Sequence, residues 1–150
     1  MFTIVRAKTT DVEMAREAML EVHERKAFDC DAMVKFLSDP ANYLFLALED
    51  ERVAGSLFGY SLVHPPMREP QFLLYEIDVR PQSRGRGTGQ ALVKAFISEA
   101  RAAGAFEVWV ITNQSNAAAM AMYAACGLRR ENPDDVMLAL PLTTLLPSTR

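Results

Sequence analysis

The sequence has little cysteine, no long apolar run and no excess of basic residues. Cys30 and Cys126 are its only cysteines, too few and too far apart for a disulfide framework or a CxxC metal site. No apolar run approaches the roughly 20 residues of a membrane span. The first residues also lack the apolar core and cleavage site of a signal peptide. We therefore expect a cytoplasmic protein with two reduced thiols, no metal and no membrane contact.

The charge balance argues against a nucleic-acid partner. The 150 residues carry 16 Lys and Arg against 19 Asp and Glu, a formal net charge of −3. Proteins that bind nucleic acid usually carry a basic excess. Half of the residues are hydrophobic, which at this length suffices for one domain with its own core. We expect a single domain over residues 1–150, with a weakly ordered tail from about residue 141.

Two nucleotide-binding motifs and one hydrolase motif are missing as well. Residues 80–92 read RPQSRGRGTGQAL, with glycine at 85, 87 and 89. This spacing does not fit the Rossmann pattern G-x-G-x-x-G, and the Walker pattern G-x-x-x-x-G-K-[ST] is absent. No G-x-S-x-G nucleophile elbow occurs either, which argues against a hydrolase.

The glycine-rich loop itself favours anion binding. It lies between a predicted strand and a predicted helix, where bare backbone N–H groups and the helix dipole attract negative charge. Arg84 and Arg86 can add charge-assisted hydrogen bonds, so a pyrophosphate is a natural ligand. The alternative is a turn that only tightens the corner between strand and helix.

The apolar periodicity predicts a mixed arrangement of strands and helices. Thr10 and Glu13 have the spacing of a capping box that would begin a helix over residues 11–26. Further helices are predicted at 31–38, 89–103 and 116–125, and strands at 2–7, 43–48, 53–63, 72–79, 106–112 and 136–140. Several strands followed by a βαβ unit indicate an α+β or α/β domain with a mixed sheet.

Three segments together resemble the GNAT superfamily of N-acetyltransferases. Residues 84–89, RGRGTG, match its acetyl-CoA loop [Q/R]-x-x-G-x-[G/A], and residues 75–81, YEIDVRP, resemble its central strand. Residues 116–128, NAAAMAMYAACGL, resemble its N-x-x-A-x-x-x-Y-x-x-x-G-[FL] segment. The resemblance implies a mixed, mostly antiparallel sheet flanked by helices and splayed around an acetyl-CoA cleft. It also implies transfer of acetyl from acetyl-CoA to an amine in a ternary complex.

The resemblance assigns two catalytic residues. Glu76 matches the carboxylate that takes the amine proton, and we expect burial to raise its pKa. Tyr123 matches the tyrosine that protonates the leaving thiolate. Asp78 is two residues from Glu76, on the same strand face, and would share its work or attract the ammonium. The alternatives are solvent-facing strand polarity for both acids and a core aromatic for Tyr123.

The cofactor contacts follow from the same resemblance. The strand backbone is expected to pair with the pantetheine arm, and the Val79 amide is the implied oxyanion donor. Asn116 would contact the pantetheine, or it only caps the following helix. The expected cofactor-binding residues are Ile77, Asp78, Val79, Arg84, Gly85, Arg86, Gly87, Thr88, Gly89, Asn116 and Tyr123.

The middle of the chain adds a narrower resemblance, to the aminoglycoside 3-N-acetyltransferases. It covers residues 53–63, the proline-rich connection after them and the strand around Glu76. Aminoglycosides are polycations, for which carboxylates are suitable contacts. The residues expected to bind such a cationic small molecule are Glu76, Asp78, Asp29, Asp31, Asp134 and Asp135.

Several alternatives stay open at this point. The acids could be ordinary solvated surface. The acceptor could be another small amine, a polyamine or a protein N-terminus, or the chain could be an inactive acetyl-CoA-binding module, although Glu76 and Tyr123 argue against that. The resemblance also allows a homodimer. His23 and His64 are interpreted as packing or surface residues outside the site.

Overall fold

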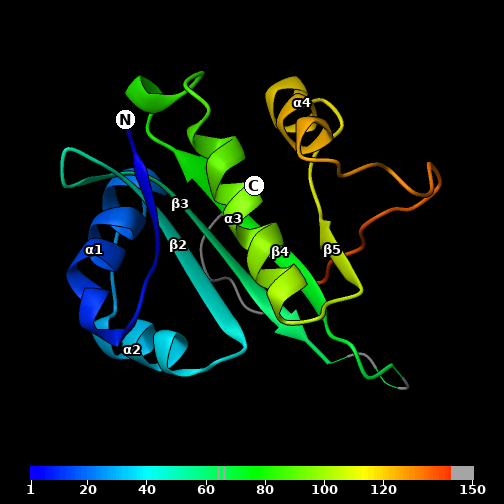
Figure 1. Ribbon diagram of the computed structural model, residues 1–150, viewed down its shortest axis with the longest axis horizontal. Helices are drawn as coiled ribbons and strands as arrows, with labels where there is room; N and C mark the ends of the chain where they lie inside the picture. Colours follow the sequence, from blue (N-terminus) through cyan, green and yellow to red (C-terminus); the bar gives the residue numbers. More distant parts are fainter. Residues whose placement is uncertain (64, 66, 143–150) are drawn as a thin grey trace.

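The computed structural model describes residues 1–63, 65 and 67–142, and it contains one five-stranded sheet (Figure 1). The strand order is β1-β2-β3-β4-β5, with antiparallel pairing except between β4 and β5, which are parallel. The strands are β1 (Thr3–Arg6), β2 (Asn42–Glu49), β3 (Arg52–Leu62), β4 (Gln71–Val79) and β5 (Glu107–Val110). The predicted mixed, mostly antiparallel sheet is confirmed.

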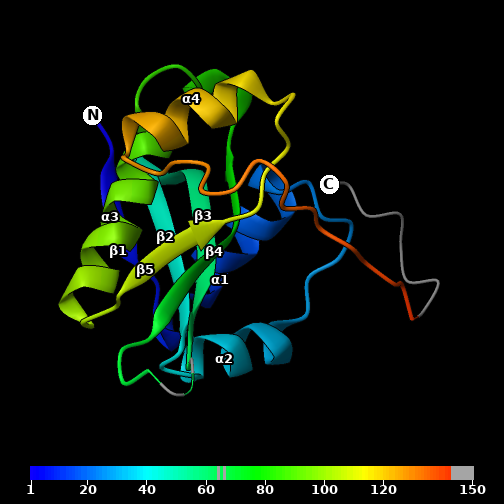
Figure 2. The ribbon, with the colours of Figure 1, turned by 90° about the vertical axis from the view of Figure 1, so that its right-hand side faces the viewer.

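Helices cover both faces of this sheet (Figures 1 and 2). On one face α3 and α4 enclose an apolar cluster that includes Phe72 and Phe96. On the other face α1 and α2 cover a second cluster around Leu44 and Leu46. The helices are α1 (Val12–Glu17), α2 (Cys30–Ser38), α3 (Thr88–Ala102) and α4 (Ala117–Ala125), with single turns η1 (Thr9–Asp11), η2 (Ala18–Val22) and η3 (Pro81–Ser83). None of the helices in the described part of the chain is long and apolar enough to span a membrane.

The first helix departs from its prediction. The expected capping box between Thr10 and Glu13 does not form; instead the Lys8 amide donates to the Asp11 carboxylate at 2.8 Å. The helix is regular only to Glu17, widens into a π-helical turn over η2, and ends well before residue 26. Glu24 then adopts φ 52°, in the left-handed region. Such π-turns are frequent at functional sites, and this one sends the residues after η2 toward the sheet.

The last predicted strand, residues 136–140, is wrong. This segment forms no strand, and Val136, Leu138 and Leu140 are at least 79% exposed. Alternation alone cannot hold a strand that has neither a neighbouring strand nor an apolar face to cover. Among the described residues, β5 is therefore the edge of the sheet. The weakly ordered tail expected from about residue 141 lies mostly outside the described residues.

A β-bulge in β4 decides which face Glu76 occupies. In the pairing with β3, Phe58 opposes Glu76 while Gly59 opposes Leu74, so Tyr75 is an extra residue. Before the bulge Leu74 points into the α3-side core; after it, Ile77 does. Without the extra residue, Glu76 would share the orientation of Leu74 and be driven into that core. The bulge therefore turns Glu76 onto the α1 side of the sheet.

The pairing of β4 with β5 is short. It begins at Gln71 with Glu107 and ends at Leu74 with Val110. From Tyr75 to Val79, β4 has no strand on its β5 side within the described chain, although it still pairs with β3. The strands diverge where the carboxyl end of β4 leads into the glycine-rich loop, as the expected splayed sheet requires.

Candidate active site

The glycine-rich loop presents unpaired amides at the N-terminus of α3. The Ala91 amide makes the first helical bond, to Gly87 O at 3.0 Å. The N–H groups of residues 85–90 make no hydrogen bond to any described residue. The first turn of a helix leaves its amides without internal partners, and here the preceding loop amides join them. This arrangement fits an anionic group with several oxygens, such as a pyrophosphate.

Two glycines in this loop need their conformational freedom. Gly85 has φ 72° and Gly87, the residue before α3, has φ 84°, both in the left-handed region that favours glycine. Gly89 has ordinary φ, and an added Cβ would lie 2.6 Å from Met122 Sδ on α4, so the methionine side chain would have to shift. Thr88 is buried and donates its hydroxyl to Ser83 O at 3.2 Å. The loop shape is thus fixed by its own residues.

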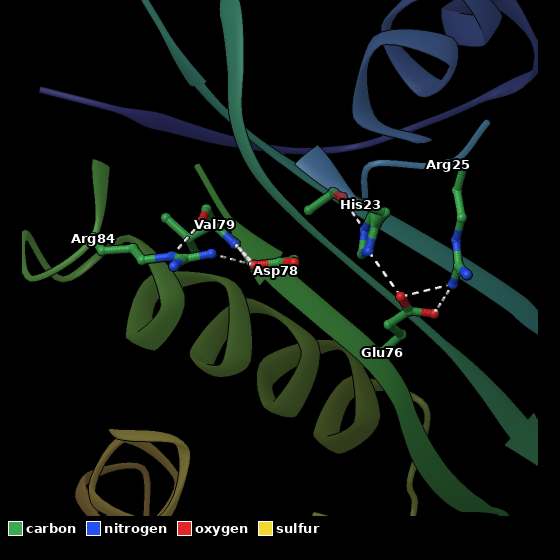
Figure 3. Close-up of polar contacts among 7 residues, drawn as sticks. His23, Arg25, Glu76, Asp78, Val79 and Arg84 are labelled. Carbon is green, nitrogen blue, oxygen red and sulfur yellow. Dashed lines mark hydrogen bonds and ion pairs between the residues drawn. The ribbon is translucent and has the colours of Figure 1, made fainter. Parts of the chain in front are cut away.

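Both loop arginines are paired with carboxylates (Figure 3 shows the first pair). Arg84 donates from Nε to Val79 O at 2.8 Å and lies 3.3 Å from Asp78 Oδ1. Arg86 pairs with Glu49, and this hydrogen bond lowers the pKa of the Glu49 carboxyl. Both guanidinium groups are at least half exposed, so a bound anion can compete for them.

The Asp78 carboxylate is bonded to Val79 and to Arg84 of the loop, and not to the partners of Glu76. This carboxylate accepts from the Val79 amide at 2.8 Å as well as from Arg84. The Val79 N–H, the expected oxyanion donor, therefore has an intramolecular partner in this structure. Asp78 shares a sheet face with Glu76, as strand alternation predicted, but no hydrogen bond or ion pair joins the two acids to a common partner among the described residues.

Glu76 lies between two cationic or potentially cationic side chains (Figure 3). Arg25 Nη2 is 2.8 Å from Oε1 and 2.7 Å from Oε2, and His23 Nδ1 is 3.0 Å from Oε1. Burial on its own would raise the pKa of Glu76, but the hydrogen bonds and charges of His23 and Arg25 outweigh it and lower the pKa. The expected rise is therefore wrong, because no sequence pattern indicates that His23 and Arg25 contact Glu76.

His23 is the site residue that the sequence analysis missed. Its side chain has no exposed surface, and its Nε2 is 2.7 Å from Ser56 Oγ, which is also fully buried. His23 and Glu76 are 53 residues apart, and Ser56 is 33 residues from His23. No local pattern in the sequence could have joined them. His64, the other histidine, lies outside the described residues.

Tyr123 lies in the α3-side core and is 7% exposed. Burial raises its pKa to about 12, with a smaller contribution from Cys126. Its hydroxyl makes no hydrogen bond to any residue that the structure describes, and the phenol keeps its proton across the physiological range. Asn116 caps α4, accepting from the Ala119 amide at 3.1 Å, which is the simpler of its two predicted roles.

The other predicted substrate acids have local roles. Asp29 caps α2 by accepting from the Ala32 amide at 2.9 Å, and Asp31 is exposed in the first turn of that helix. Asp134 and Asp135 bond to Asn132 within one turn. None of these contacts connects them to Glu76. Among the described residues, no group of three or more His, Cys, Asp or Glu side chains is arranged to hold a metal ion.

Solved structures share this fold over nearly the whole chain. An aminoglycoside acetyltransferase from an uncultured soil metagenomic sample, in complex with trehalose, has a TM-score of 0.85 at 23% identity, covering 95% of this chain and 97% of that one. The aminoglycoside N-acetyltransferase AAC(6')-Iy in complex with CoA has a TM-score of 0.75 at 19% identity, covering 95% and 96%. At these identities the likeness concerns the fold alone.

Curated relatives carry several substrate names. A mycothiol acetyltransferase of Kocuria rhizophila is 34% identical over 64% of this chain and 32% of its own length. N-acetyltransferase 8B of Homo sapiens is 28% identical over 67% of this chain and 44% of its own. The chain thus spans less than half the length of these relatives. The [ribosomal protein bS18]-alanine N-acetyltransferase of Salmonella typhimurium is 29% identical over 95% of this chain and 99% of its own.

The family model of the GNAT acetyltransferases matches the part of the chain that carries this site. The match covers residues 11–128, from the start of the first helix through the loop, Glu76 and Tyr123 to the end of α4. It agrees with the sheet, the splay and the loop described above. The chain belongs to the acetyltransferase (GNAT) family.

Proposed function

We propose that this N-acetyltransferase acetylates an amino group of an aminoglycoside, with Glu76 as proton acceptor and Tyr123 as the proton donor for the leaving thiolate. Acetyl-CoA, the acetyl donor of the family, supplies an acetyl thioester when bound. The observation that supports the proposal most is the Arg25 guanidinium, which lies within 2.8 Å of both Glu76 oxygens and is 42% exposed. It occupies the position that a substrate ammonium would take.

The loop fits the pyrophosphate of that donor. The amides of residues 85–90 have no hydrogen-bond partner in the described part of the chain, and Arg84 and Arg86 lie in exchangeable pairs beside them. The backbone of residues 77–79, which has no strand on its β5 side, would bind the extended part of the ligand by β-type hydrogen bonds. For this, the Asp78 carboxylate must release the Val79 amide.

Glu76 can act as a base only after the substrate ammonium has taken the place of Arg25. An alkyl ammonium has a pKa of about 10.4, far above that of a carboxyl held by Arg25 and His23. When the substrate cation replaces Arg25, one positive charge beside Glu76 is exchanged for another, but the ammonium, unlike the guanidinium, carries the proton that must be removed. Glu76 then takes the amine proton directly or through a water.

The choice of an aminoglycoside as the acceptor rests on resemblance. The segment around Glu76 resembles aminoglycoside 3-N-acetyltransferases, and neighbours with TM-scores of 0.84 to 0.85 bear the name aminoglycoside acetyltransferase. The 3-amino group is the position that this resemblance favours. A protein N-terminus is the second candidate, because the bS18-alanine acetyltransferase is related over nearly its whole length.

The experiment that tests the acceptor is thiol release from acetyl-CoA with a panel of amines. The panel holds kanamycin, gentamicin, spermidine, lysine and a short peptide that begins with alanine. Release with the aminoglycosides alone supports the first proposal. Release with the peptide alone replaces it with the second candidate, and release with neither contradicts both acceptors.

The first prediction concerns the proposed acid. Tyr123→Phe is expected to lower kcat roughly 10- to 100-fold, while acetyl-CoA affinity and Tm stay near the wild-type values. The hydroxyl makes no hydrogen bond to the described chain, so its removal leaves the packing intact. Steady-state kinetics and thermal melting measure the two effects. Tyr43→Phe is the matched control, a tyrosine buried in the same cluster. Equal kcat in both variants would remove Tyr123 from this role.

The second prediction concerns Arg25. Its charge lowers the pKa of Glu76, so Arg25→Ala should raise that pKa and move the acid limb of kcat/KM to higher pH. In the wild type, ionised Glu76 stabilises the fold above the unfolded pKa of about 4.3, and this contribution is lost as the pH falls through the lower folded pKa. The variant should therefore lose less stability on acidification. Arg25→Lys, which keeps the charge, should resemble the wild type; an unmoved acid limb in Arg25→Ala would contradict the assignment.

A further inference from the structure

Both ring nitrogens of His23 have partners. Nδ1 lies 3.0 Å from Glu76 Oε1 on β4, and Nε2 lies 2.7 Å from Ser56 Oγ on β3. The side chain has no exposed surface, and its ring meets that of Phe58 in a T-shaped arrangement, with centroids 5.7 Å apart. Phe58 is also the cross-strand partner of Glu76. His23 is thus fixed from three directions.

The chemistry of the two partners sets the proton on His23. An ionised carboxylate only accepts hydrogen bonds, so Nδ1 must carry a proton toward Glu76. A serine hydroxyl can donate to a neutral ring or accept from a protonated one. Ser56 therefore satisfies Nε2 in either charge state, and His23 keeps its hold on Oε1 in both. The Ser56–His23–Glu76 order is that of a hydrolase triad, but Ser56 has no exposed surface and cannot reach a substrate.

Arg25 can be displaced by a substrate, whereas His23 is enclosed by the protein. Its side chain is 42% exposed and bonds both carboxylate oxygens, so a substrate cation can replace it. His23 is enclosed and bonds only Oε1. After Arg25 leaves, His23 still fixes one oxygen, and Oε2 is the oxygen left free for the amine.

We propose that His23, anchored by Ser56, is the positioning residue of Glu76 and presents its Oε2 to the acceptor amine. The proposal rests on the proposed role of Glu76 as proton acceptor. It does not depend on which amine is acetylated, because the hydrogen bonds that join Ser56, His23 and Glu76 are present before an acceptor binds. It explains why His23 and Ser56 are buried on the inner side of Glu76, whose other side is covered only by the exchangeable Arg25.

Two substitutions test the hydrogen bonds of the two His23 ring nitrogens one at a time. By side-chain length, the amide nitrogen of Asn falls near the place of Nδ1 and that of Gln near the place of Nε2. His23→Asn should keep the bond to Glu76 and retain kcat within about threefold, whereas His23→Gln keeps only the bond to Ser56 and should lose about 10- to 100-fold in kcat with KM for acetyl-CoA unchanged. Equal kcat in the two variants would overturn the proposal.

The pH profile gives a readout that a merely structural role would not move. The titratable groups that face Glu76 are His23, Arg25, Tyr60 and Tyr75. The hydrogen bond and the charge of His23 both lower the pKa of Glu76. The acid limb of kcat/KM should therefore move to higher pH in His23→Gln, which loses both, and move less in His23→Asn, which loses only the charge. An unmoved limb in His23→Gln contradicts the positioning role.

A measurement that needs neither His23 variant nor turnover, made on the wild type and on Ser56→Ala, covers the case in which both His23 variants unfold or no acceptor is found. Nitrogen-15 NMR of the His23 ring should show a protonated Nδ1 from pH 6 to 8. In Ser56→Ala the Nδ1 proton should persist but exchange with solvent faster, since the anchor is gone. A ring protonated only at Nε2 would overturn the proposal, whatever the activity panel gives. Failure of the proposed function would instead appear as absent turnover with the Nδ1 proton in place.

Discussion

Glu76→Gln is expected to lower turnover by about 100-fold or more, because general-base catalysis typically contributes 10²- to 10⁴-fold and an amide cannot accept the amine proton. The amide oxygen of Gln, in the place of Oε1, can still accept from His23 and Arg25, and only the Arg25 hydrogen bond to the place of Oε2 is lost. Acetyl-CoA is proposed to bind at the loop and along β4, so its affinity should stay unchanged. Thiol-release kinetics and calorimetric titration of acetyl-CoA measure the two quantities.

The control for this variant is Glu99→Gln. Glu99 lies on α3 and pairs with Arg6 at 2.6 Å, away from the site. Its substitution removes the same charge without touching Glu76 or its partners, so turnover should stay near the wild-type value. Wild-type turnover of Glu76→Gln at neutral pH would remove Glu76 from the base role.

The second large effect is expected at Gly87. Gly87→Asp should abolish measurable acetyl-CoA binding, because it places a carboxylate among the amides proposed to hold a pyrophosphate. It also forces a side chain onto a residue with φ 84°, a conformation that costs on the order of 1 kcal/mol without glycine. Calorimetric titration of acetyl-CoA, with the Tm as a check of folding, measures the outcome.

Gly104→Asp is the matched control for backbone strain and charge. Gly104 follows α3, has φ 71°, and has no atom within 4 Å of an added Cβ, as is also true of Gly87. Its substitution introduces the same charge and a similar strain at the other end of the same helix. Binding should survive there. Loss of binding in both variants would assign the effect to folding, and normal binding in Gly87→Asp would refute the loop assignment.

The local elements of the site could be predicted because their causes are local. Gly85 and Gly87 adopt left-handed conformations that suit glycine, and Asn116 caps the helix that follows it. Each depends on backbone chemistry within a few residues, which a sequence displays directly. The spacing of these signals also predicted the order of strands and helices. The prediction of a strand at 136–140 failed because an alternation of apolar and polar residues does not by itself provide a neighbouring strand.

The charge environment of Glu76 could not be predicted. Strand alternation placed Glu76 and Asp78 on one face, but the face itself depends on the extra residue Tyr75, which only the pairing with β3 reveals. The expected rise in the pKa of Glu76 followed from burial alone. The fold instead brings Arg25 and His23 to the carboxylate from a turn more than 50 residues earlier, and these partners lower the pKa.

The sequence by itself determined the glycine loop, the bounds of α3 and α4, the order of most elements and the resemblance to an acetyltransferase, because these depend on residues that are neighbours in the chain. Only the tertiary structure decided that Glu76 turns away from the α3-side core, that Arg25 covers it, and that the buried pair of His23 and Ser56 lies behind it. The physical reason is that a bulge, a π-turn and a buried hydrogen bond are set by packing between distant segments, which the order of residues does not display.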